Sequence, residues 1–83
     1  MMRVRLKYTS DLGFDWLEKE VLMDESNYQS VIDEYVKENK DKANALSDKW
    51  DLDGNSDELY LNFIIVDRNP TLFRMIDNYM DDI

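Results

Sequence analysis

The chain contains neither cysteine nor histidine, and these two absences remove whole classes of chemistry. Without cysteine there are no disulfides, no thiolate nucleophile and no zinc site built on sulfur. Without histidine the protein lacks the commonest metal ligand and the commonest general base near neutral pH. Its serines therefore have no obvious activating base, and with only two glycines it has no glycine-rich phosphate loop. We expect a protein that is not an enzyme and that uses no cofactor.

Long hydrophobic runs are also missing. No apolar stretch approaches the roughly 20 residues that cross a bilayer, and "MMRVRLKY" contains no apolar signal region. We therefore expect a cytoplasmic protein. The length of 83 residues suits one compact domain, which we expect to span 1–83. The aromatic content of 12% argues against disorder, because disordered acidic tails lack such side chains.

Positive charge is scarce. There are 10 Lys and Arg against 19 Asp and Glu, which gives a formal net charge of −9. Residues 1–42 contain seven basic and ten acidic side chains, a net charge of −3, and residues 43–83 contain three and nine, a net charge of −6. Such a field repels nucleic acids and anionic membranes and attracts basic proteins. We expect a basic protein partner, with no direct contact to nucleic acid or to a membrane.

Alternation of apolar and charged residues predicts two strands, at 2–9 and 14–23, that form a hairpin. The apolar face of the first strand consists of Met2, Val4, Leu6 and Tyr8. A register in which paired residue numbers sum to an odd value keeps both faces consistent. It places Glu18 and Glu20 against the Arg and Lys row, and it leaves Trp16 on the charged face as a candidate contact residue.

A stripe of apolar residues at three- and four-residue steps predicts a helix after the hairpin. Ser26 and Gln29 stand at capping-box spacing, so we expect the helix to begin near Ser26. The same periodicity continues to about residue 48. The helix either runs that far or breaks into two near "NKDK", residues 39–42.

The segment 58–67 is nearly continuous apolar sequence, which predicts the most buried strand. A closing helix follows, with Asn69 as its N-cap and Pro70 at its first position. The order β-β-α-β-α predicts a two-layer α+β domain, with a small three-stranded sheet, antiparallel or mixed, and helices packed on one face.

The stretch "DKWDLDGNSDELY", residues 48–60, resembles a calcium loop. An EF-hand loop needs glycine at position 6 and glutamate at position 12. Placing Gly54 at position 6 puts Tyr60 at position 12, and placing Asp51 at position 1 puts Ser56 at position 6. The stretch is also similar to β-propeller calcium loops, although its last aspartate comes two residues early. Three interpretations stay open: a calcium site, an ordinary polar turn and an acidic contact surface.

Acidic residues at the end of the last predicted helix add to this contact surface. A helix C-terminus carries partial negative charge, so aspartate there costs some tenths of a kcal/mol. A local cost without local compensation is typical of a binding surface, although a frayed helix end tolerates it too. Tryptophan is enriched at binding hot spots, which makes Trp50 a candidate anchor unless it covers the core edge. The candidate protein-binding residues are Asp48, Trp50, Asp51, Asp53, Asp57, Glu58, Asp77, Asp81 and Asp82.

Together these features favour a non-enzymatic, acidic protein-binding module. The most specific version of this hypothesis is an inhibitor that mimics nucleic acid and blocks the basic groove of a nucleic-acid-binding protein or nuclease. In profile the sequence resembles phage-encoded inhibitors, the anti-CRISPR proteins and the nuclease and glycosylase inhibitors, without a shared motif. If a phage encodes the protein, we expect it in the cytoplasm of the host cell. Two alternatives stay open. One is a small accessory or structural domain whose acidity serves solubility, as a monomer or a homodimer, and the other is a calcium-responsive module.

Overall fold

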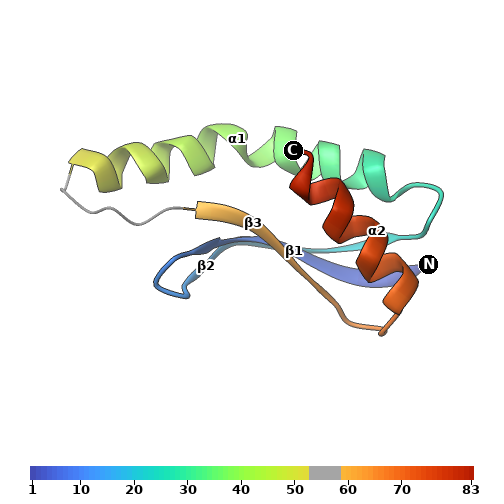
Figure 1. Cartoon of the computed structure of the whole chain (residues 1–83). Coiled ribbons are helices and arrows are strands. Elements are labelled where there is room, and N and C mark those ends of the chain that lie inside the picture. The colour runs from blue at the N-terminus through green and yellow to red at the C-terminus, as the bar shows by residue number, and fades with distance from the viewer. Residues whose placement is uncertain (53–58) are drawn as a thin grey trace.

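The computed structural model describes the backbone of residues 1–52 and 59–83 and the side chains of residues 1–49 and 59–83. The elements follow the predicted order: β1 (Met2–Ser10), β2 (Asp15–Met23), α1 (Tyr28–Leu52), β3 (Leu59–Ile65) and α2 (Pro70–Asp81) (Figure 1). The strands form one antiparallel sheet in the order β2-β1-β3. Both helices contribute to a core on one face of this sheet. The predicted two-layer α+β architecture is confirmed.

The core lies where the inner face of β1 meets both helices. Alternation in β1 directs Val4 and Leu6 inward, and both are fully buried. Burying a large aliphatic or aromatic side chain contributes about 1.5–3 kcal/mol each, and every element supplies at least one such residue. The core residues are Val4, Leu6, Met23, Ile32, Tyr35, Phe63, Leu72 and Ile76.

The central strand of the sheet is β1, which contradicts the prediction that the strand at 58–67 is the most buried. That strand, β3, lies at an edge of the sheet. Phe63 on its inner face is buried, whereas Tyr60 and Ile64 on its outer face are 49% and 45% exposed. A continuous apolar run indicates burial on both faces only where both faces are covered. Here the core covers the inner face alone.

A β-bulge interrupts the pairing of β1 with β2. The paired residue numbers sum to an odd value through the first part of β1, as predicted, and to an even value from Tyr8 onward. Leu17 and Glu18 thus lie opposite Lys7 alone, and Leu17 has a left-handed φ of 58°. The bulge pairs Trp16 with Tyr8. Because directly opposite residues share a face, the prediction that Trp16 lies on the charged face is wrong.

A buried tyrosine of α1 holds this bulge in place. The Tyr35 hydroxyl donates a hydrogen bond of 2.7 Å to the backbone carbonyl of Leu17. The Tyr35 ring also stacks on that of Tyr8, with 5.9 Å between the ring centroids. Burial raises the pKa of the Tyr35 phenol, so its hydroxyl stays protonated as the donor. This contact fixes the position of α1 over the hairpin.

The start of α1 differs from the predicted capping box. One carboxylate oxygen of Asp24 accepts hydrogen bonds from the backbone N–H groups of Ser26 (3.0 Å) and Asn27 (3.1 Å). The Asn27 side chain in turn accepts from the N–H of Asp24 at 2.8 Å. Asp24 and Asn27 therefore form the reciprocal pair predicted for Ser26 and Gln29. From Tyr28 the helix runs unbroken to Leu52, so the break at 39–42 does not occur.

Hydrogen bonds at Asp67 and Asn69 hold the connection from β3 to α2 in place. Asp67 accepts hydrogen bonds from Arg3, at 2.7 Å from its Nη2 atom and 2.9 Å from its backbone N–H. These bonds hold the pKa of Asp67 below its ordinary value. Asn69 caps α2 as predicted, because its side chain accepts from the N–H of Leu72 at 3.0 Å. The intervening Arg68 has a left-handed φ of 43°.

We expect Tyr35→Phe to lower the free energy of unfolding by about 1–2 kcal/mol, because it leaves the Leu17 carbonyl without its donor. Urea denaturation measures this difference. Tyr28→Phe is the control on the same helix, since the Tyr28 hydroxyl accepts a hydrogen bond of 3.3 Å from the exposed side chain of Gln29. A similar loss in both variants would contradict the assigned role of Tyr35.

We expect the stabilisation by Asp67 to depend on pH. Its folded-state pKa is lowered, so the stabilisation is present above the ordinary aspartate pKa of about 3.9 and is lost as the pH falls through the lower folded value. The melting temperatures of the wild type and Asp67→Asn should therefore converge below about pH 4. Circular dichroism melts across this range test it. Arg3→Gln removes the other partner and should converge in the same way; a gap that persists at low pH contradicts the assignment.

Candidate protein-binding surface

The structure describes the predicted contact residues in part. Four have described side chains, and all four are exposed: Asp48, Asp77, Asp81 and Asp82. Trp50 and Asp51 lie in the last turn of α1, where only the backbone is described. Asp53, Asp57 and Glu58 lie outside the described residues. The calcium-loop interpretation concerns that segment too, and it stays a prediction.

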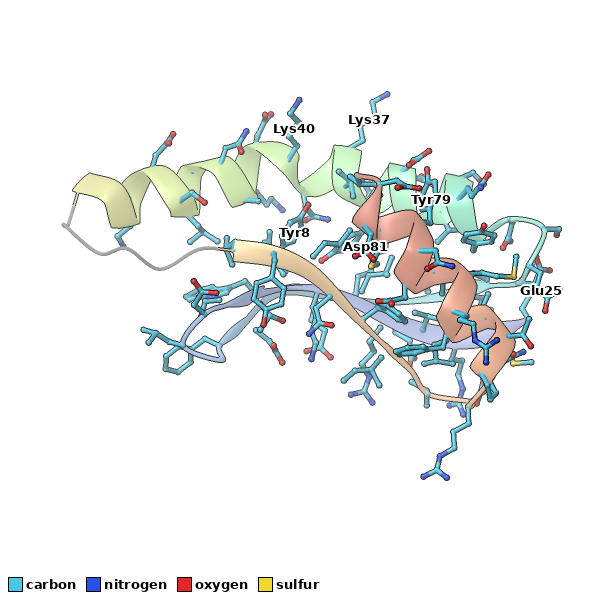
Figure 2. The ribbon with its side chains drawn as sticks, in the orientation of Figure 1. Tyr8, Glu25, Lys37, Lys40, Tyr79 and Asp81 are labelled. Atoms are coloured by element: carbon cyan, nitrogen blue, oxygen red, sulfur yellow. The ribbon has the colours of Figure 1, made fainter. Side chains whose placement is uncertain are left out.

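An acidic groove lies between β3 and the C-terminal half of α2. It has a volume of about 430 Å³, and Asp77 and Asp81 line it on the helix side. Tyr60 and Asn62 line it on the strand side. Asp77 and Asp81 are four residues apart, so they lie on successive turns of the same helix face. Figure 2 marks Asp81 near the end of α2.

Two local effects make these aspartates unfavourable for α2. Like charges at this spacing destabilise a helix by about 0.2–0.5 kcal/mol. Asp81 also lies in the last turn, where the helix dipole disfavours negative charge, and this turn contains no basic residue. Asp82, the C-cap, adds a third carboxylate beside them. The helix therefore carries an acidic end that its own stability does not favour.

The structure does not bring Asp48 to this groove. The two helices meet where the hydroxyl of Tyr79 donates to the carboxylate of Asp33, which raises the pKa of Tyr79 (Figure 2). Asp48 lies fifteen residues beyond Asp33 along α1. That separation corresponds to about 22 Å at 1.5 Å per residue. The predicted surface therefore consists of two separate parts. One lies on α2, where Asp77 and Asp81 line the groove, and the other lies on α1 and includes Asp48.

The cations of the sheet already have carboxylate partners. Arg3 pairs with Asp67 at 2.7 Å and Lys7 with Asp15 at 3.0 Å. Two longer pairs join Arg5 to Glu18 at 3.8 Å and Lys19 to Glu38 at 3.2 Å. No ion pair among the described residues includes Asp77, Asp81 or Asp82. Their negative charge is therefore available to a partner molecule.

Sequence reasoning missed a second groove, at the other end of β3. It has a volume of about 580 Å³, and its lining includes Ile64, Phe73, Arg68 and Arg74. Alternation within "LYLNFII" places Ile64 on the outer face of the strand, but the groove forms only because this strand lies at the edge of the sheet, beside α2. The edge position follows from pairing with β1, which is distant in sequence.

No group of three or more carboxylates in the described part of the chain is arranged to hold a metal ion. Neither helix, as far as it is described, has an apolar stretch long enough to cross a bilayer. Comparisons with protein-family models, with curated proteins and with solved structures found no significant match.

We expect Asp81→Asn to stabilise the protein by a few tenths of a kcal/mol to about 1 kcal/mol at low ionic strength, because it removes a charge that α2 disfavours. Thermal melts measure the effect. Asp41→Asn removes the same charge from an exposed site within α1, away from the helix end. A stabilisation of equal size there would mean that net charge, and not position, is the cause.

Proposed function

We propose that this chain is a non-enzymatic protein-binding module whose acidic groove receives basic side chains of a partner protein. The supporting observation is a pair of exposed carboxylates, Asp77 and Asp81, that line a groove without an ion pair among the described residues. Their spacing places like charges on one helix face, and Asp81 also lies in the last turn, where the helix dipole disfavours negative charge. Residues that break a local rule without local compensation are expected at functional sites.

In its finer form the proposal is an inhibitor that mimics nucleic acid. Carboxylates on a small rigid domain take the place of phosphates in the basic groove of a nuclease or another nucleic-acid-binding protein. The net charge of −9 supports this, since it attracts basic grooves over a long range. Phage-encoded anti-CRISPR proteins and the nuclease and glycosylase inhibitors represent the type of inhibitor meant.

The distribution of lysines favours the α2 side as the mimicking surface. Lys37 and Lys40 project from α1 away from the sheet (Figure 2). Their positive charge interrupts any continuous row of carboxylates on the outer face of α1. The acidic groove lies between β3 and α2, and Asp77 and Asp81 line its helix side.

A capture experiment followed by competition tests the proposal. The immobilised protein is exposed to bacterial lysate at low salt, and captured proteins are identified by mass spectrometry and purified. We expect a basic nucleic-acid-binding protein whose affinity falls with rising salt and which short duplex DNA displaces. Asp77→Lys combined with Asp81→Lys should weaken binding about tenfold or more.

The matched control is Glu34→Lys combined with Asp41→Lys, which makes the same charge change at exposed sites on α1. This control should retain most of the binding. An equal loss in both double variants would contradict the groove as the site. Binding that ignores salt, or no purified partner, would favour a domain whose acidity serves solubility. Binding that DNA does not displace would contradict the mimicry of nucleic acid, but it would leave the acidic groove as a binding site.

A further inference from the structure

The second groove combines an apolar wall with two arginines. It lies between the C-terminal part of β3 and the N-terminal half of α2. The side chains of Ile64 and Phe73 are 45% and 50% exposed there. The Phe73 ring rests on that of Phe63, with 5.1 Å between the centroids, so a firm aromatic surface forms the floor. A concave apolar surface with a few polar groups is typical of a binding site.

Arg68 and Arg74 line this groove, and neither forms an ion pair with any described residue. The arginines of β1 differ, because Arg3 and Arg5 each pair with a carboxylate. In a chain with 19 acidic residues, two guanidinium groups beside one apolar groove leave a local site for an anion. A guanidinium binds a carboxylate through two parallel hydrogen bonds, which makes it selective for that group.

The backbone of Arg68 is held in an unfavourable conformation. Its φ of 43° lies in the left-handed region, which residues with a Cβ atom seldom adopt. Its neighbours impose this conformation, since Asp67 is fixed by Arg3 and Asn69 caps α2. Glycine would fit this position with less strain. Strain of this kind in a residue that lines a groove is an indication of function.

We infer that this groove binds an acidic segment of a partner protein, one that presents a carboxylate beside an aromatic or aliphatic side chain. Arg68 and Arg74 bind the carboxylate, and the apolar side chain packs on Ile64 and Phe73. The source is a protein and not a nucleic acid or an anionic membrane, because the net charge of −9 repels any extended negative surface. A short segment with one or two carboxylates escapes most of that repulsion.

The segment binds mainly through its side chains. Addition of a strand to β3 would need the backbone N–H groups of the free edge. At Phe63 that group is already engaged, because it donates to the Asn62 side chain at 2.8 Å. Phe63 lines both grooves, so one partner lying along β3 would reach the acidic groove as well.

Selection from a random library of displayed 12-residue peptides tests the inference. The whole chain is the target, and the double variant Arg68→Gly with Arg74→Gln serves for counter-selection. We expect enriched peptides that contain Asp or Glu next to Phe, Trp, Tyr, Leu or Ile. One enriched peptide, made synthetically, should shift the amide NMR signals of Ile64, Phe73 and Arg74.

Single variants separate binding from folding. Arg74→Gln should weaken the synthetic peptide about tenfold, the value expected when a charge-assisted hydrogen-bond pair is lost. Arg68→Gly should weaken it similarly while the melting temperature stays the same or rises, since glycine relieves the strain. The control, Lys37→Gln with Lys40→Gln, removes two positive charges from α1 and should bind normally.

Three results would overturn the inference. The first is a selection that enriches no peptides over the counter-selected variant. The second is enrichment of peptides without acidic residues. The third is arginine-dependent binding to vesicles of phosphatidylserine and phosphatidylcholine, which would assign the groove to lipid. None of these results bears on the acidic groove, because every variant here leaves Asp77 and Asp81 unchanged.

Discussion

Two helices cover one face of a three-stranded sheet, and this single covered face determines most of what the molecule presents to solvent. On the outer face, basic residues of β1 lie among their own carboxylate partners, so the sheet contributes little free positive charge. The apolar run of β3 is buried on one side only. Because α2 lies beside this edge strand, the two elements leave grooves along their junction.

The two grooves differ in the sign of their charge. Arg68 and Arg74 lie toward the N-terminal half of α2, and Asp77 and Asp81 lie toward its C-terminal half. This arrangement is the reverse of the one that the helix dipole favours. A helix with acidic residues near its N-terminus and basic residues near its C-terminus would be more stable. Stability therefore does not explain the observed order of charges.

Local patterns in the sequence predicted much of the fold. Alternation identified both strands of the hairpin, periodicity identified both helices, and Asn69 with Pro70 marked the start of α2. The bulge at Leu17 was not predictable in this way, because the Tyr35 hydroxyl that holds it lies 18 residues away. The conformation of Arg68 likewise depends on Arg3, which pairs with its neighbour Asp67 across 64 residues.

The same difference between local patterns and long-range contacts applies to the candidate surface. Asp77 and Asp81 were recognisable because their spacing and their place in the helix are local properties. The groove that they line was not, because its opposite wall is β3. The second groove, which Arg68 and Arg74 line, was missed for a related reason. Nothing near Ile64 in sequence indicates whether its strand lies at the centre or at the edge of the sheet.

The hydrogen bond between Asn62 and the N–H of Phe63 has a consequence for behaviour at high concentration. The strand "LYLNFII" combines aromatic and aliphatic residues without proline, which is the composition of segments that stack into intermolecular sheets. An edge strand of this kind is a template for aggregation unless its backbone is protected. By occupying a backbone donor in the middle of β3, a single amide side chain makes it harder for two copies to join edge to edge. One polar residue in an otherwise apolar strand is therefore expected to disfavour edge-to-edge pairing of two copies.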